Sequence, residues 1–156
     1  MGTDKAAIDY RGETFLDRAQ SLLRQVGCDP VLISGRPGLA GGVEDSHPGA
    51  GPAQAIFDAM THLPDDCSGA LFIPVDMPLL TPDDLAPLLS AQRPSAWIDH
   101  PLPVFLPAIS PLPPREDVRS VKYLFSCLDT HWRELPPDRL GHFRNFNTAA
   151  DLNVLD

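Results

Sequence analysis

Short apolar runs alternate with amphipathic helical patterns along most of this chain, and this alternation limits the possible folds. Residues 14–26 carry apolar side chains at helical spacing, and the run VLIS at 31–34 has the composition of a buried strand. The two patterns return as a helix at 52–63 and a strand that ends at Asp76. Such repetition predicts an α/β protein with layered helices and a mostly parallel sheet.

Composition excludes several other classes of protein. Of the 156 residues, 18 are proline, which disrupts the interior turns of long helical bundles. The net charge of −9 disfavours sequence-independent binding to nucleic acid or to anionic membranes. No apolar run approaches the roughly 20 residues of a membrane helix. We therefore expect a single domain over 1–156, located in the cytoplasm, with its three cysteines as free thiols.

Polar residues lie where the predicted strands end, which is where α/β sheets bind their ligands. Asp76 ends an apolar strand, so its carboxylate either binds Mg²⁺ or caps a loop. A glycine-rich loop at 35–51 contains Asp45 and leads through Gly51 and Pro52 into the next predicted helix. The amino end of that helix is either an anion site or simply a tight turn.

The remaining candidate residues also have ordinary structural interpretations. Lys5 lies near the start, His100 precedes a proline at a strand junction, and Asn145 and Asn147 stand just before the last predicted helix. Such residues are more often surface, capping or turn residues than ligands. No histidines or cysteines have the spacing of a metal site. Function therefore cannot be assigned from any one of them.

Taken in order, these segments resemble the molybdenum cofactor guanylyltransferases, a family of Rossmann-like nucleotidyltransferases. The opening MGTDK is similar to the end of the family's L-A-G-G-x-S-x-R-M-G-x-D-K loop. GPAQA at 51–55 corresponds to G-P-L-A-G, and VDMP at 75–78 corresponds to the strand-end acid. HPLPVF at 100–105 matches a Q/H-P-L stretch, and NFNTAADL at 145–152 matches N-x-N-T-x-x-D/E-L. The resemblance covers nearly the whole chain and implies a three-layer nucleotidyltransferase fold.

The resemblance implies an enzyme that transfers GMP from GTP to molybdopterin, giving the guanine dinucleotide cofactor and pyrophosphate. It implies Lys5 and Asp76 as catalytic residues, with Lys5 on the phosphates and Asp76 holding Mg²⁺. Asp45, Gly51 and Pro52 would bind the nucleotide together with Lys5. Catalysis would depend on positioning and on charge neutralisation rather than on covalent chemistry.

For the second substrate, the resemblance places His100, Asn145 and Asn147 towards the pterin. We add Arg119 and Lys122 for its anionic tail. Residues 93–144 carry seven bases and six acids, whereas residues 29–91 carry one base and nine acids. This asymmetry suits an anionic second substrate, although solvated faces would give the same counts. The implied binding partners are GTP and molybdopterin, and molybdenum-cofactor delivery proteins or acceptor molybdoenzymes are further candidates.

Two departures from the family pattern affect these expectations. The family's first strand and most of its L-A-G-G-x-S-x-R loop have no counterpart here, so two apolar strand flanks should lack ladder partners. We expect that the start site is assigned one segment too late; the alternative is a truncated, non-catalytic binding module. Ala55 also replaces a family glycine. A cytidylyltransferase of the same cofactor stays open because the missing loop helps to choose the base, although the Asp4–Lys5 pair favours guanine.

Overall fold

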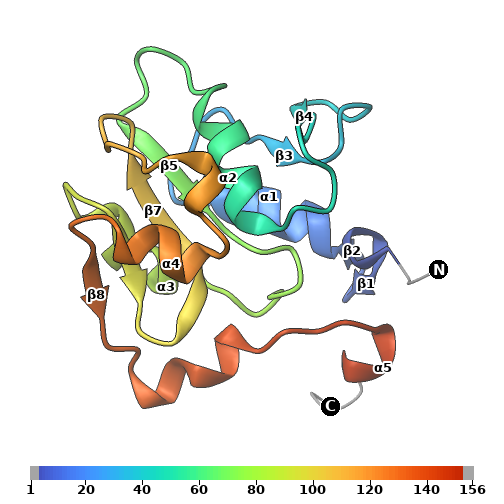
Figure 1. The fold of residues 1–156 in the computed structure, drawn as a ribbon. Helices are drawn as coiled ribbons and strands as arrows, with labels where there is room; N and C mark the ends of the chain where they lie inside the picture. The colour runs from blue at the N-terminus through green and yellow to red at the C-terminus, as the bar shows by residue number, and fades with distance from the viewer. Residues whose placement is uncertain (1–3, 153–156) are drawn as a thin grey trace.

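A four-stranded mixed sheet forms the centre of the structure, a computed structural model that describes residues 4–152 (Figure 1). Its strands lie in the order β5 (Gly69–Phe72), β7 (His100–Pro107), β6 (Ser95–Trp97) and β8 (His131–Arg133). β7 runs antiparallel to both of its neighbours, and β6 runs parallel to β8. This sheet is therefore not mostly parallel as predicted, because a short connection makes β6 and β7 a hairpin.

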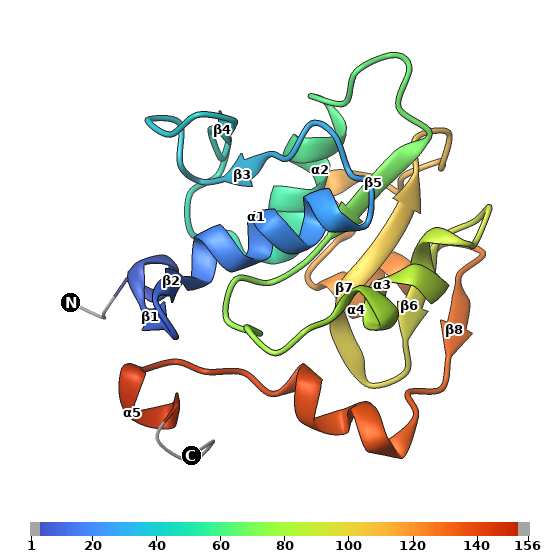
Figure 2. The same ribbon diagram turned by 180° about the vertical axis from the view of Figure 1, so that it is seen from behind.

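Helices cover both faces of the sheet. α2 (Pro52–Met60) and α4 (Val121–Ser126) lie on the face towards the viewer in Figure 1. α1 (Phe15–Gln25) and α3 (Pro82–Leu89) lie on the opposite face, as the reverse view in Figure 2 shows. The predicted α/β class and its three layers are confirmed.

Alternation along β7 divides the core into two parts. Val104 and Leu106 pack with Ile56 of α2 on one face, whereas Phe105 packs with Leu85 of α3 on the other. Successive side chains of a strand point to opposite faces of a sheet, and here both faces are buried. The apolar run from Pro103 to Pro107, which is buried throughout, follows from that double burial.

The prolines of β7 are accommodated by its pairing pattern. Pro107 stands opposite Gly69 in a pair that exchanges no hydrogen bond, because the neighbouring Ala108 N–H donates to the Ser68 carbonyl. The β6 register shifts between Ala96 and Trp97, so the prolines at 101 and 103 lie beside this irregularity. The sequence predicts that prolines in this segment mark edges or bulges, and the irregularity beside Pro101 and Pro103 confirms it.

Smaller elements surround this sheet. They are η1 (Lys5–Ala7), β1 (Asp9–Tyr10), β2 (Glu13–Thr14), β3 (Ile33–Ser34), β4 (Gly42–Val43), η2 (Arg115–Asp117), η3 (Pro137–Phe143) and α5 (Ala149–Leu152). The C-terminal segment returns to the β1–β2 hairpin, where Phe146 and Leu152 pack with Ile8 and Phe15. Within residues 4–152, no helix has the length and apolar character needed to cross a membrane.

Local capping explains where the helices begin and end. Thr81 starts α3, with its backbone N–H donating to Asp84 Oδ2 at 2.8 Å and Pro82 at the first helical position. The fully buried Asp84 also contacts His142 Nδ1 at 2.9 Å and so ties η3 to α3. α1 begins after Thr14, whose hydroxyl oxygen accepts the Asp17 N–H at 3.1 Å.

β3 and β5, both of which are short, belong to different sheets. β3 pairs in parallel with β4, and β5 pairs with β7 along one edge. Within residues 4–152, the sides of β3 and β5 that face each other have no ladder partner, which confirms the expectation for two strand flanks. These two flanks border the candidate site.

Candidate functional site

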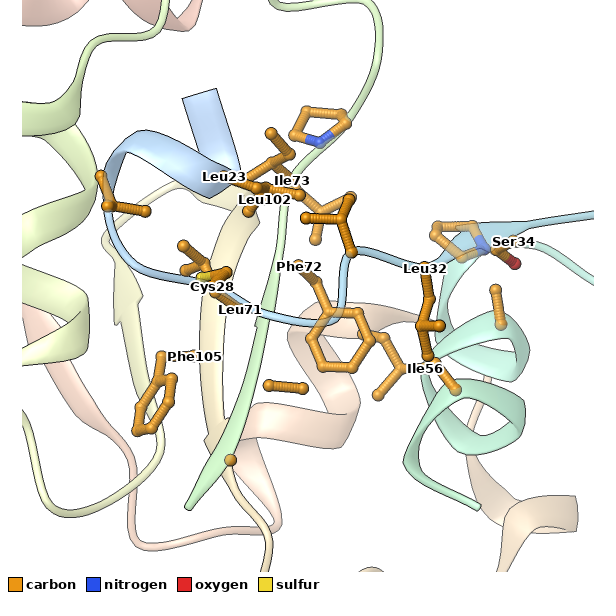
Figure 3. A pocket seen from close by; sticks show the side chains of 18 of the residues that line it. Leu23, Cys28, Leu32, Ser34, Ile56, Leu71, Phe72, Ile73, Leu102 and Phe105 are labelled. Carbon is orange, nitrogen blue, oxygen red and sulfur yellow. The ribbon is translucent and has the colours of Figure 1, made fainter. Parts of the chain in front are cut away.

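A cavity of about 870 Å³, here called the β3–β5 cavity, lies between these two strands. Apolar side chains form its walls, including Leu23 of α1, Ile56 of α2, and Leu32, Leu71 and Ile73 from the strand segments (Figure 3). The residues that line it also include Lys5, Ser34, Asp76 and Asn145. An apolar cavity with a few convergent polar groups is typical of a ligand site.

Lys5 and Asp76 form an ion pair at this cavity. Lys5 Nζ donates to Asp76 Oδ2 at 2.8 Å, and the Asp76 side chain is 18% exposed. The Asp76 carbonyl accepts the Phe146 N–H at 2.8 Å, which holds the adjacent Asn145 beside it. Three segments that are remote in sequence, carrying Lys5, Asp76 and Asn145, are thus brought together.

A second ion pair joins the start of the described chain to the end of β3. Arg36 Nη1 donates to Asp4 Oδ2 at 2.8 Å, and Nη2 pairs with the other carboxylate oxygen. This guanidinium lowers the pKa of Asp4, and the carboxylate in turn raises the pKa of Arg36. Because Asp4 precedes Lys5, the two ion pairs place the carboxyl ends of β3 and β5 at the same edge.

Asp45 is bonded to the same edge. Ser34 Oγ donates to Asp45 Oδ1 at 2.6 Å. A Cβ atom added to Gly35 would lie 2.9 Å from Asp45 Oδ2, and Gly35 has a φ of +72°. Glycine is therefore needed at position 35 both for its backbone conformation and for the approach of the Asp45 carboxylate.

The loop that follows Asp45 is fastened to α2 by Asp58. This carboxylate accepts the Ser46 N–H at 2.9 Å, the Ser46 hydroxyl at 2.7 Å and Arg115 Nη2 at 2.7 Å. Burial opposes ionisation of Asp58, but the bonds from Ser46 and Arg115 outweigh it and hold its pKa below the ordinary value. Sequence analysis missed this cluster, because no motif links Arg115 to an acid 57 positions away.

Gly51 and Pro52 take the positions predicted for the start of α2. Gly51 is the N-cap residue with a φ of 89°, and Pro52 occupies the first helical position and lines the β3–β5 cavity. The free backbone amides of this helix end therefore adjoin the loop that carries Asp45.

His100 and Lys122 lie at a different place. Both line a smaller cavity of about 170 Å³ together with Trp132, and neither lines the β3–β5 cavity. Lys122 Nζ is 3.7 Å from Asp99 Oδ1, and both side chains are largely exposed. Burial lowers the pKa of His100 against the opposing effect of the Asp99 carboxylate.

The other residues predicted for the pterin side are also dispersed. Arg119 is exposed and lines neither of these two cavities. The Asn147 N–H donates to Asp151 Oδ2 at 2.8 Å, which is a helix-capping contact. Of the five residues predicted there, the structure brings Asn145 to the Lys5–Asp76 pair.

The Asp76 carboxylate is the kind of ligand that holds Mg²⁺ in proteins when substrate phosphates supply the other ligands. Within residues 4–152, no group of three or more His, Cys, Asp or Glu side chains is arranged to hold a metal. Asp76 Oδ1 takes no part in the bond to Lys5. Mg²⁺ is commonly held by one or two carboxylates together with substrate phosphates and water, so the single Asp76 carboxylate fits such a role.

A sequence model of the MobA-like NTP transferase domain matches residues 1–107. The chain belongs to this family. Its relatives include a molybdenum cofactor guanylyltransferase of Xanthomonas euvesicatoria pv. vesicatoria, 37% identical over 108 residues, which are 68% of this chain and 57% of the relative. A probable molybdenum cofactor guanylyltransferase of Rhodopirellula baltica is 29% identical over 166 residues, covering 99% of this chain and 76% of the relative.

The fold of the MobA-like chain is shared with a solved structure. Molybdopterin-guanine dinucleotide biosynthesis protein A from Archaeoglobus fulgidus matches with a TM-score of 0.65 at 17% identity, over 98% of this chain and 89% of that one. The family and fold predicted from the sequence are thereby confirmed. The match to the Xanthomonas relative spans little more than half of that protein, 57% of its length.

Proposed function

We propose that this chain transfers GMP from GTP to molybdopterin and releases pyrophosphate. Support comes from its family and from two relatives whose names specify guanylyl transfer to the molybdenum cofactor. The observation that carries the proposal is the Lys5–Asp76 pair, held at the common edge of β3 and β5 with Asn145 beside it. A cation and a carboxylate at such an edge suit a metal-bound triphosphate.

The proposed reaction is a single displacement at phosphorus. A terminal phosphate oxygen of molybdopterin forms a bond to the α-phosphorus of GTP. The bond from that phosphorus to the bridging oxygen breaks, and pyrophosphate leaves with the electron pair. The Lys5 ammonium offsets the negative charge of the phosphates, which is the main way in which proteins assist such transfers. Asp76 would hold Mg²⁺, and that ion would supply further charge neutralisation.

The nucleoside end of GTP is assigned to the loop between β3 and α2. The Asp45 carboxylate can accept N–H or O–H donors of the base or ribose, and Ser34 holds it in place. The backbone amides that follow Gly51 favour an anion at the start of α2. Pro52 lines the same cavity and orients this helix end.

Asn145 is proposed for the pterin side because it adjoins Asp76. Contacts of His100, Asn147, Arg119 and Lys122 with molybdopterin stay predictions, since these residues lie apart from the Lys5–Asp76 pair. A cytoplasmic location and transfer of the product to molybdoenzymes belong to the same proposal.

Pyrophosphate release tests this function. The protein is mixed with molybdopterin and Mg²⁺, and release from GTP is compared with release from CTP. We expect release from GTP that requires molybdopterin and falls at least about 100-fold in Asp76→Asn. Asp65→Asn is the matched control, because Asp65 is an exposed acid outside the cavity.

Two other outcomes of this assay would replace guanylyl transfer with another function. A preference for CTP would make the protein a cytidylyltransferase of the same cofactor. No release from either nucleotide, together with no binding of either, would favour a non-catalytic binding module.

A further inference from the structure

The segment that carries Asn145 is held on both sides of this residue. It runs along one side of the molecule, from β8 to the β1–β2 hairpin (Figure 2). After Asn145, the fully buried Phe146 donates its N–H to the Asp76 carbonyl at 2.8 Å. Before it, Phe143 is buried and packs edge-on against Trp97, with ring centroids 6.0 Å apart. The place of Asn145 beside Asp76 therefore depends on what fixes this segment to the core.

Asp84 of α3 bonds to this segment from within the core. Its side chain is fully buried, and its Oδ2 lies 2.9 Å from Nδ1 of His142. The same oxygen accepts the Thr81 N–H at 2.8 Å and the Thr81 hydroxyl at 2.7 Å, so it acts as an acceptor and His142 Nδ1 donates. Arg139 of η3 approaches the other carboxylate oxygen at 3.5 Å. Donors from η3 and from the start of α3 thus meet on one buried carboxylate.

These bonds join the two stretches of chain that carry Asp76 and Asn145. Thr81 stands five positions after Asp76, and His142 stands three positions before Asn145. Asp84 accepts from both Thr81 and His142, so it fixes one stretch against the other. The relative positions of the two site residues therefore depend on a carboxylate that does not itself line the β3–β5 cavity.

Helix capping accounts for only part of this arrangement. A capping box needs the bonds between Thr81 and Asp84, and an exposed acid can supply them. Complete burial of a carboxylate costs free energy unless donors surround it. The bond from His142 adds nothing to the cap of α3. Its structural effect is to hold the segment that carries Asn145.

We propose that Asp84 and His142 are positioning residues that set Asn145 beside Asp76 for the second substrate. Neither of the two lines the β3–β5 cavity, so they act through Asn145. The inference rests on the proposed function, in which Asn145 contacts molybdopterin and Asp76 holds the metal ion of the nucleotide. Displacement of a substrate-orienting group by about 1 Å can reduce a rate about 100-fold. Loss of the His142 bond should therefore impair the use of molybdopterin more than the binding of GTP.

Steady-state kinetics of His142→Ala tests this difference. The Thr81 bonds to Asp84 remain in this variant and keep the stretch after Asp76 in place. We expect kcat/KM for molybdopterin to fall at least about tenfold, whereas the Kd of GTP with Mg²⁺ changes less than about twofold. His62→Ala is the matched control, because His62 is exposed and lies outside the cavity.

Two amide variants test the position of the donor. His142→Asn places an N–H where Nδ1 stood, because both nitrogens are bonded to Cγ, and it should restore most of the rate. His142→Gln places its N–H one bond further from the backbone and should behave like His142→Ala. A cooperative melt of each variant shows that it is folded.

Amide hydrogen exchange gives a readout that needs no nucleotide. Exchange at Phe146 reports on its bond to the Asp76 carbonyl. We expect His142→Ala and His142→Gln to speed this exchange at least about tenfold, and His142→Asn to leave it close to wild type. Leu124 is the reference amide and should not change, because it bonds to the Ser120 carbonyl and belongs to the other core cluster.

Three results would overturn the inference. Unchanged exchange at Phe146 in His142→Ala would show that the bond to Asp84 does not hold the segment. Equal losses for molybdopterin and for GTP would indicate a general loss of structure rather than a displaced Asn145. Equal activity of His142→Asn and His142→Gln would mean that the donor position is unimportant. A wild-type protein that transfers no GMP would contradict the proposed function instead, and exchange at Phe146 would still decide whether His142 holds the segment.

Discussion

Asp58→Ala should destabilise the protein markedly, although Asp58 contacts none of the proposed catalytic residues. The substitution removes the acceptor of three hydrogen bonds, two from Ser46 and one from Arg115. Asp58 is 6% exposed, so water cannot fully replace these bonds. Hydrogen bonds to charged groups contribute about 1.5–3 kcal/mol each, but they are not additive when they share one acceptor.

The exposure of Arg115 limits the loss. Its side chain is 29% exposed, so the guanidinium regains hydration when Asp58 is removed. We therefore expect a loss of about 2–3 kcal/mol rather than the full cost of an isolated buried charge. For a domain of 156 residues, this corresponds to a fall in Tm of about 6–9 °C.

Urea unfolding and thermal melts measure this loss. Asp65→Ala is the control, because Asp65 is exposed and is expected to change stability by less than about 0.5 kcal/mol. If Asp58→Ala were as stable as the control, the bonds to Ser46 and Arg115 would not form in solution. Asp58 would then not fasten the loop after Asp45.

Three further predictions concern neighbouring features. Because folding lowers the pKa of Asp58, the stability that this carboxylate adds is fully present above about pH 4 and is lost as pH falls through the folded-state pKa. The free energy of unfolding of Asp58→Asn should therefore approach that of wild type in acid, and a difference that does not change with pH would refute this. Gly35→Ala should cost about 1–3 kcal/mol in urea unfolding and exceed Gly12→Ala, which shares a positive φ but adds no close contact; equal losses would contradict the contact with Asp45. Lys122→Ala should alter the free energy of unfolding by less than about 0.5 kcal/mol, because its ion pair is exposed, and a larger loss in thermal melts would show a role that this pair does not explain.

Local signals predicted the helices well. The Thr81, Pro82 and Asp84 pattern marked the start of α3, and apolar spacing over 14–26 marked α1. Sheet topology was harder to predict, because the direction of β7 depends on a two-residue connection that leaves little trace in the apolar pattern. The spacing of apolar side chains along the sequence indicates which faces of a strand are buried, but it does not indicate which other strand lies beside it.

The candidate site was predicted in part. Motif order led to Lys5, Asp76 and Asn145, and the structure brings these three together. Motif order did not reveal the Asp4–Arg36 pair. The one signal for this pair in the sequence is that Arg36 is the single Lys or Arg between residues 29 and 91. Basic composition also suggested Arg119 and Lys122, but surface charge carries no information about the distance to a site.

Calorimetric titration with GTP measures whether the Lys5–Asp76 pair binds the triphosphate and its metal ion. We expect binding that requires Mg²⁺. Both Asp76→Asn and Lys5→Ala should weaken it at least about tenfold, and Asp65→Asn should leave it unchanged. GTP binding of equal strength in all four proteins would contradict the assignment of the Lys5–Asp76 pair to the triphosphate and its metal ion.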